Sequence, residues 1–255
     1  MTRHRHDTLI AAHRGGALLW AENSLTAFRG ALTLPVDQVE TDVRLSLDHE
    51  PFLLHDATLD RTTIATGIAS RLDFATLSTI ALKGSPGDTI PHLSQLLELL
   101  APSAIDLRLE MKCDADEQCQ PNLPPIVLAH LDRAGMRSRT TITSFECDYL
   151  KAFEATPGLA GRIWLVRRPL ALELGFEKLV QTAISESIGE IALHISQASL
   201  TDRNMAEKAG LRLGFFGAND TTAIAEAFTR RASAFTTDRP DLAVAYRLGQ
   251  RASSA

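Results

Sequence analysis

The sequence predicts an α/β fold, a (β/α)8 (TIM) barrel with an extra β-hairpin strand after the second barrel strand. Short apolar or β-branched runs alternate with segments of helical spacing, which is typical of parallel sheets built from strand–helix units. Eight such runs fit a closed barrel, and 255 residues match the length of about 250 that one barrel uses. One connection is too short to hold a crossover helix, and it predicts the hairpin.

The predicted barrel strands are residues 9–13, 38–45, 105–112, 140–145, 161–166, 190–195, 211–217 and 233–238. Helices are predicted between most of them. The first has an apolar stripe at Leu25, Phe28 and Leu32 and begins at Asn23 or Ser24 as its N-cap. Further helical segments lie near 93–100, 124–135, 146–156, 173–187, 201–210 and 220–231.

The hairpin is predicted just after Leu45. Only SLDHE separates this strand from the strand-like PFLLHD, which is hairpin spacing. With a turn centred near Asp48 and His49, the paired residue numbers sum to about 97, so His55 is expected opposite Asp42. The second strand would therefore return a histidine to the C-terminal rim of the barrel.

Composition restricts the classes of function. The net charge is −5, the pI is about 5.9 and no basic patch stands out, which argues against nucleic-acid binding. No linker divides the chain, so a single domain is expected over 1–255, with tails at 1–7 and 248–255. The absence of an export signal or a long apolar run predicts a cytoplasmic protein without stable membrane insertion. The cysteines Cys113, Cys119 and Cys147 are expected as free thiols.

Carboxylates gather at predicted strand ends. Glu40 and Asp42 are two residues apart on one strand and point to the same face, and Glu110 ends another strand with Lys112 on its face. Three inward carboxylates would repel one another without a cation. They favour a site for one divalent cation, Mg²⁺ or Ca²⁺. The alternative is a solvated strand end with salt bridges to Arg44 or Arg108.

Histidines occupy the same rim. His13, Arg14 and two glycines follow the first strand, and His55 is expected to return to it. Two histidines of near-neutral pKa suit a base and an acid in one cycle, and a guanidinium suits a phosphate oxygen. His194 ends a later strand and is a candidate substrate contact. The remaining histidines are expected in the tail, a turn or on helix surfaces without a functional role: His4, His6, His49, His92 and His130.

A series of motifs resembles one family. HRGGALLWAENSLTAFRGAL, VETDVRLSLDHEPFLLHDATLDRTT, IPHLSQLLELL, LRLEMK, TSF and TTDRPD follow one another from about residue 9 to 243. This order closely resembles the glycerophosphodiester phosphodiesterases, barrels related to phosphatidylinositol phospholipase C. The resemblance implies a phosphoric diester hydrolase that uses a divalent cation to cleave a small-molecule glycerophosphodiester into glycerol phosphate and an alcohol.

The resemblance also implies roles. Glu40, Asp42 and Glu110 become metal ligands, and His13 and His55 become the acid–base pair. Arg14 and Lys112 become phosphate contacts. The motif positions Glu22, Asn23 and Asp56 are expected to support these residues or to cap a helix. Which histidine is the base stays open at this point.

The sequence departs from the family pattern at one late strand. Where the family often has Trp-Thr-Val-Asn, this chain has Phe216-Gly217-Ala218-Asn219, so Phe216 is expected to line a differently shaped substrate pocket. Long insertions between residues 55 and 110 are absent, which favours a small or polar substrate. Two alternatives remain: the same chemistry on an opine-type sugar phosphodiester or a lysophospholipid, and a non-catalytic barrel that binds a metal or a phosphodiester. Homo-oligomerisation is left open.

Overall fold

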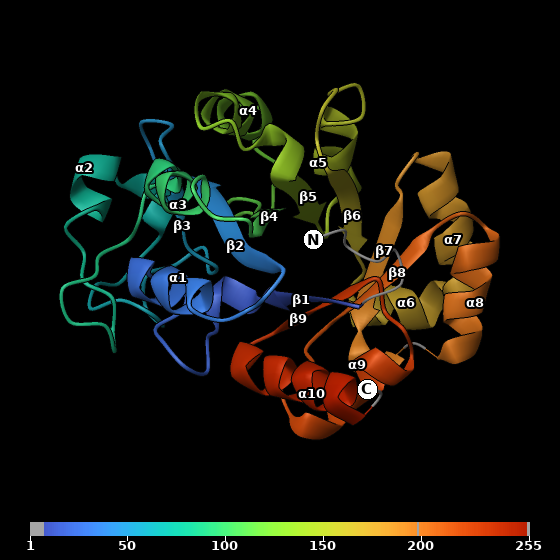
Figure 1. Cartoon of the computed structure of the whole chain (residues 1–255). Coiled ribbons are helices and arrows are strands. Elements are labelled where there is room, and N and C mark those ends of the chain that lie inside the picture. The colour runs from blue at the N-terminus through green and yellow to red at the C-terminus, as the bar shows by residue number, and fades with distance from the viewer. Residues whose placement is uncertain (1–7, 198, 254–255) are drawn as a thin grey trace.

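The computed structural model describes residues 8–197 and 199–253 and shows a closed barrel (Figure 1). Its parallel strands follow the order β1-β9-β8-β7-β6-β5-β4-β2, and β2 pairs with β1 to close the ring. β3 lies outside the ring, antiparallel to β2. The bounds are β1 (Leu9–Ala12), β2 (Gln38–Leu45), β3 (Pro51–Leu53), β4 (Asp106–Met111), β5 (Thr140–Ser144), β6 (Gly161–Leu165), β7 (Glu190–His194), β8 (Arg212–Phe216) and β9 (Ala234–Thr237). The predicted barrel with its hairpin is thereby confirmed.

Helices surround the strands (Figure 1). They are α1 (Leu25–Leu32), α2 (Phe74–Leu77), α3 (Leu93–Leu100), α4 (Leu123–Arg133), α5 (Cys147–Ala152), α6 (Arg168–Leu174), α7 (Phe176–Ser185), α8 (Leu200–Lys208), α9 (Thr221–Thr229) and α10 (Pro240–Ser253). Ser24, not Asn23, caps α1: its Oγ accepts from the Ala27 N–H at 2.9 Å. None of the described helices combines the length and the apolar character that crossing a bilayer requires.

The hairpin register differs by one residue from the expected one. Val43 pairs with Leu53, and the Leu54 N–H donates to the Asp42 carbonyl at 3.2 Å, so Leu54 and not His55 lies opposite Asp42. The turn closes tightly because the Ser46 N–H donates to the Glu50 carbonyl at 3.0 Å. His55 still reaches the rim because β3 ends at Leu53. His55 lies beyond the strand, so the alternation of side chains between the two faces of a strand no longer sets the direction of its imidazole.

Among the described residues, two clusters of buried side chains stabilise the fold. The main one fills the barrel and the layer between strands and helices, and β2 is buried along almost its whole length because helices cover its outer face. A separate cluster is formed by β3 and the segment that joins it to α3: Phe52, Leu54, Leu59, Ala69, Leu77, Leu82 and Ile90. This second core supports the hairpin from outside the barrel.

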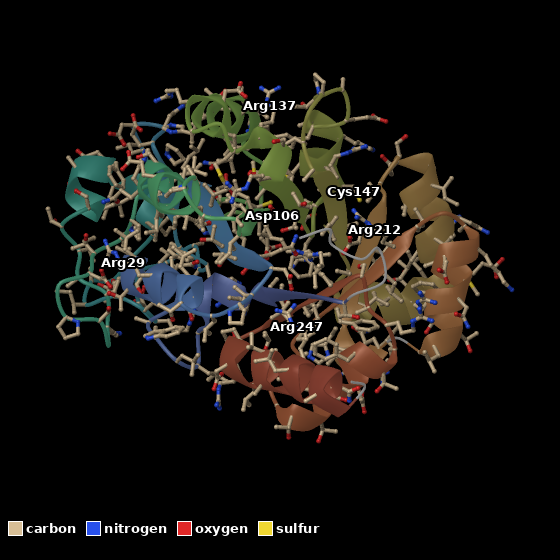
Figure 2. All side chains as sticks on the ribbon, viewed as in Figure 1. Arg29, Asp106, Arg137, Cys147, Arg212 and Arg247 are labelled. Carbon is tan, nitrogen blue, oxygen red and sulfur yellow. The ribbon has the colours of Figure 1, made fainter. Side chains whose placement is uncertain are left out.

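Within the described residues, three helices were not anticipated: the single-turn α2, α6 and α10. α10 runs through Leu248 to Ser253, so most of the expected tail at 248–255 is helical. The helix docks because Tyr246 stacks on Phe228 with ring centroids 5.2 Å apart, and because Arg247, which is labelled in Figure 2, forms an ion pair with Asp37 at 2.5 Å. These partners lie far away in the sequence, so no local pattern reveals them. The other expected tail, residues 1–7, lies outside the described residues.

Candidate active site

The turn after β1 carries the first group of site residues. Arg14 has a left-handed backbone (φ 51°), and Gly15 (φ 83°) and Gly16 (φ 111°) follow it. A Cβ on Gly15 would lie 2.8 Å from Ala27 Cβ, so only glycine fits between this turn and α1. The turn directs the Arg14 N–H to Glu40 Oε2 at 3.0 Å and points the side chains of His13 and Arg14 to the rim.

The three expected metal-ligand carboxylates meet at this rim. Oxygens of Glu40, Asp42 and Glu110 lie within 4.8 Å of one another, and each residue is no more than 5% exposed. Burial, and then the negative charge of Asp42, raise the pKa of Glu40 to about 7. Asp42 Oδ1 is buried and accepts no hydrogen bond within the described residues. Crowded buried oxygens of this kind fit a hard divalent cation, which would relieve their repulsion.

Asp42 is held between two cations. Arg14 Nε lies 3.2 Å from its Oδ2, and Lys112 Nζ lies 3.1 Å from its Oδ1 without being aligned for a hydrogen bond. Burial opposes the ionised form, but the charges of Lys112 and Arg14 outweigh it and lower the pKa of Asp42. Lys112 also contacts Glu110 Oε1 at 2.5 Å. The ion pairs therefore involve Arg14 and Lys112, and not the alternative partners Arg44 and Arg108.

His13 has a carboxylate partner that the sequence reasoning did not single out. Its Nδ1 lies 2.5 Å from Asp238 Oδ1, just after β9, and its Nε2 lies 3.8 Å from Glu40 Oε2. Asn219 holds Asp238 in place by donating from Nδ2 to Oδ2 at 2.6 Å. Burial opposes protonation, but Glu40 and then Asp238 outweigh it and raise the pKa of His13. The signal was present, because Asp238 lies in the TTDRPD motif at the end of the last strand.

His55 heads a second chain of contacts. Its Nδ1 lies 2.6 Å from Asp56 Oδ1, and the Arg61 Nε donates to Asp56 Oδ2 at 2.6 Å. Arg61 also donates to both oxygens of Glu22, which accepts from Arg14 at 2.9 Å. Burial lowers the pKa of His55. Arg61, from the RTT motif, was not singled out either, yet it connects the two sides of the rim.

Asn23 supports the carboxylates and does not cap a helix. Its Nδ2 donates to Asp42 Oδ2 at 2.9 Å, and its Oδ1 accepts from the Thr41 Oγ1 at 2.8 Å. The residue has a left-handed backbone (φ 56°), which asparagine tolerates better than most side chains. This contact orients the Asp42 oxygens toward the rim.

A cavity of about 200 Å³ lies inside this rim. Its walls include the three apolar side chains Phe145, Leu165 and Phe216 beside the charged residues, and it adjoins a more open hollow lined by Asp56, Cys113 and Arg167. Phe145 and Phe216 meet edge to face at 6.0 Å. His194, the candidate substrate contact, is not among the residues that line either hollow. Its ring lies next to that of Phe216, with centroids 5.6 Å apart, and its Nδ1 contacts Ser196 Oγ at 2.8 Å.

The fold and the rim together place the chain among the (β/α)8 barrels with a polar site at the carboxyl ends of the strands. The family model of the glycerophosphoryl diester phosphodiesterases matches residues 13–242. The chain belongs to this family, and the resemblance drawn from its motifs is confirmed.

Individual relatives agree with this assignment. The glycerophosphodiester phosphodiesterase of Caldanaerobacter subterraneus subsp. tengcongensis is 27% identical over 143 residues, and the match covers 54% of this chain and 58% of that protein. A structure from Agrobacterium tumefaciens, assigned to the glycerophosphoryl diester phosphodiesterases, is 32% identical with a TM-score of 0.93 and covers 96% of this chain and 98% of its own. A phosphodiesterase of Oleispira antarctica, solved with its product sn-glycerol-3-phosphate, shares the fold at 23% identity, a TM-score of 0.81 and coverages of 92% and 94%.

Proposed function

We propose that this chain hydrolyses a glycerophosphodiester to glycerol phosphate and an alcohol, with a divalent cation and two histidines at the barrel rim. One observation carries the proposal: two histidines, each with a carboxylate on Nδ1, line the same cavity as Glu40 and Glu110, and the buried Asp42 lies beside these two carboxylates. Membership of the family supports it.

The cation would be held by Glu40, Asp42 and Glu110. When bound, it would polarise the phosphoryl oxygens and lower the pKa of a bound hydroxyl. Mg²⁺ and Ca²⁺ both suit three carboxylates, because each takes oxygen ligands. Arg14 and Lys112 bring positive charge to the same place, where it balances the carboxylates and attracts a phosphate.

The histidines move the protons. With Nδ1 held by Asp238 in His13 and by Asp56 in His55, the Nε2 atom of each ring is left to take or to deliver a proton. One ring deprotonates the attacking hydroxyl, from water or from the substrate, and the other protonates the leaving alkoxide. The reaction consumes one water overall and returns both rings to their starting states.

The shape of the cavity favours a small alcohol. Its volume of about 200 Å³ lies below the range of about 300–1,000 Å³ that drug-sized ligands occupy. Phe216 forms one wall next to Gly217, where a Cβ would lie 2.6 Å from His194 Nε2. A side chain at position 217, such as the threonine of the family pattern, would therefore require His194 to move.

The decisive experiment is a hydrolysis assay on the purified chain. We expect release of glycerol phosphate from glycerophosphocholine, its loss in EDTA and its return with Mg²⁺ or Ca²⁺. Parallel assays with an opine-type sugar phosphodiester and a lysophospholipid test the substrate, and faster turnover of either would replace the glycerol assignment. If no diester is cleaved in an EDTA-sensitive manner, the chain is a binding barrel and the proposal is wrong.

A further inference from the structure

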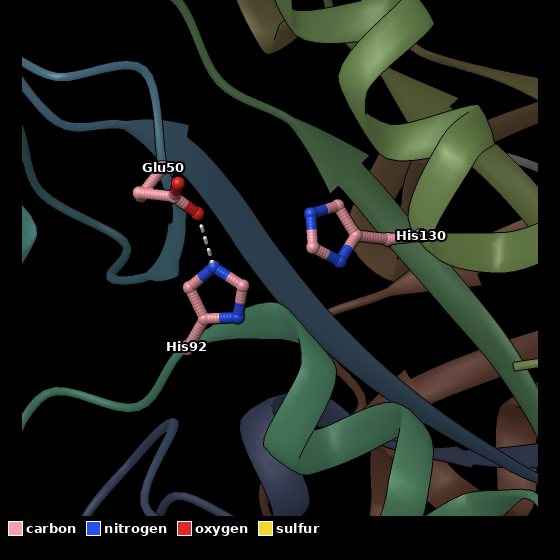
Figure 3. Close-up of side chains that lie close together, drawn as sticks. All are labelled: Glu50, His92 and His130. Atoms are coloured by element: carbon pink, nitrogen blue, oxygen red, sulfur yellow. Dashed lines mark hydrogen bonds and ion pairs between the residues drawn. The ribbon is translucent and has the colours of Figure 1, made fainter. Parts of the chain in front are cut away.

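Glu50, His92 and His130 lie close together outside the catalytic cavity (Figure 3), and neither histidine was expected to have a functional role. Glu50 belongs to the turn between β2 and β3, His92 is the N-cap of α3, and His130 lies in α4. Their segments are separated by about forty residues each, so only the tertiary fold brings them together.

The geometry of the three resembles a set of metal ligands. One potential ligand atom from each residue lies within 4.8 Å of the other two. Glu50 Oε2 and His92 Nε2 are 3.0 Å apart, and the rings of His92 and His130 are 5.1 Å apart at 63°. Figure 3 shows His130 beside this pair, and its ring nitrogens have no hydrogen-bond partner within the described part of the chain.

His92 is fixed in position by groups that suit both of its neutral forms. The Ser94 N–H lies 3.0 Å from His92 Nδ1 and can donate to it, while Ser94 Oγ lies 2.8 Å from the same nitrogen and can accept from it. When Nδ1 carries the proton and Ser94 Oγ accepts it, the lone pair of Nε2 faces Glu50. Such a contact on the far nitrogen is what orients histidine ligands in metal sites.

We propose that Glu50, His92 and His130 bind one zinc-type divalent ion, with a water as its fourth ligand. Two imidazoles and one carboxylate favour Zn²⁺ over Mg²⁺ or Ca²⁺, which prefer oxygen ligands. The Glu50 side chain is 49% exposed, which leaves the ion a path from solvent and room for the water.

Binding requires only a small contraction. Ligand atoms around tetrahedral Zn²⁺ are about 3.4 Å apart, as follows from bond lengths of about 2.0–2.1 Å. Glu50 and His92 are already within this spacing at 3.0 Å, and the three ligand atoms lie within 4.8 Å of one another, so the pair and His130 need to approach each other by no more than about 1.4 Å. The ion connects the β2–β3 turn to α3 and α4, and thereby stabilises the hairpin that leads to His55.

Calorimetric titration of Zn²⁺ into the full chain tests the proposal. Millimolar Mg²⁺ is present to occupy the oxygen ligands of the rim, and His4→Ala and His6→Ala remove the two imidazoles of the N-terminal segment. We expect one Zn²⁺ per chain and a higher Tm in its presence. Both Glu50→Gln and His130→Ala should weaken Kd by at least about 10-fold.

His49→Asn is the matched control. This exposed histidine precedes Glu50 in the same turn, and asparagine suits its left-handed backbone (φ 66°). Its Zn²⁺ affinity should equal that of the parent. The proposal is overturned if the parent binds no Zn²⁺ in excess Mg²⁺, or if Glu50→Gln and His130→Ala, folded by circular dichroism, bind it as tightly as the parent does. Glu50→Gln changes an exposed side chain, so its result does not depend on a damaged core.

Discussion

The side chain of Asp42 illustrates how single residues set the chemistry of the rim. It is fully buried, yet it stays ionised because Lys112 and Arg14 lie beside it. Among the described residues, no lysine or arginine forms a side-chain ion pair with Glu40, and burial next to Asp42 raises its pKa to about 7 although His13 and Arg14 oppose this shift. Two carboxylates on one strand therefore differ in charge, and a bound cation is the simplest way to keep both ionised.

Removing one of the proposed ligands tests the cation site. We expect Glu110→Gln to lower kcat/KM on the diester by at least about 100-fold, because a preorganised charge at the reacting phosphate is lost. The fold should persist, since glutamine has the same shape. Glu98→Gln, on the exposed face of α3, is the control and should keep its activity. Full activity in Glu110→Gln would exclude this residue as a ligand.

Replacing the partner of His13 tests the histidine pair. If one histidine must be protonated and the other neutral, kcat/KM has a bell-shaped dependence on pH. Its alkaline limb then follows the higher of the two histidine pKa values. Glu40 and Asp238 raise the pKa of His13, whereas burial lowers that of His55, so His13 governs the alkaline limb. Asp238→Asn removes a negative charge, and this limb should move to lower pH.

The readout is kcat/KM measured across the pH range, with circular dichroism as the check on folding. A purely structural role of Asp238 would reduce activity equally at every pH and leave both limbs in place. That result would contradict the proposed coupling between Asp238 and His13.

At the scale of single elements, the turn after β1 and the β2–β3 hairpin position the site. The turn uses three consecutive residues with positive φ, and it fits because Gly15 has no Cβ to meet Ala27 of α1. The hairpin carries the chain from Asp42 out of the barrel and back to His55, and its own buried cluster supports it. Both elements act through backbone geometry that glycine or a tight turn provides.

Substitution of Gly15 should show this constraint. We expect Gly15→Ala to lower the free energy of unfolding by about 1–3 kcal/mol, because a Cβ is strained at φ 83° and collides with α1. Urea denaturation gives the value. Gly249→Ala, at an exposed position of α10, is the control. The new Cβ would have no atom within 4 Å, so the free energy of unfolding should stay unchanged or rise by up to about 1 kcal/mol, because alanine favours a helix more than glycine does. Equal stability of the two variants would contradict the clash.

At the scale of the whole molecule, closure of the barrel joins the two ends of the chain. β1 pairs with both β2 and β9, so His13 meets Asp238 across a separation of 225 residues. α10 secures this junction through Arg247 and Asp37. The site consequently forms only when the barrel is closed. A cation that binds this site should therefore stabilise the folded protein.

Added Mg²⁺ or Ca²⁺ should therefore raise the Tm of the whole protein. At about 100 times its Kd, an ion that binds only the folded state contributes about 2.7 kcal/mol. Differential scanning calorimetry with and without the ion measures the shift. In Glu110→Gln the shift should shrink, because one of the three proposed ligands is lost. An unchanged Tm in saturating ion would contradict a native-state site at the rim.

Much of the fold and many of the rim residues were predictable because the sequence patterns that indicate them lie within a few neighbouring residues. The bounds of the barrel strands differ from expectation by no more than one residue at either end, since apolar alternation and turn residues mark them, whereas the hairpin strand β3 ends three residues earlier than expected. His13, Glu40, Asp42, His55 and Glu110 were identified from strand ends and motifs, and the structure places them around one rim, although their catalytic roles stay a prediction. The single domain over 1–255, the cytoplasmic location and the substrate likewise stay predictions.

By itself the sequence determined the barrel, its hairpin, the family and the chemical types of the rim residues, because a strand's end and its two-residue alternation are encoded within a few neighbours. Only the tertiary structure decided which residues are partners. Asp238 on His13, Arg61 between Asp56 and Glu22, and His130 beside His92 all depend on contacts between distant segments. Such contacts form when the barrel closes and helices pack around it, so no pattern of neighbouring residues in the sequence predicts them.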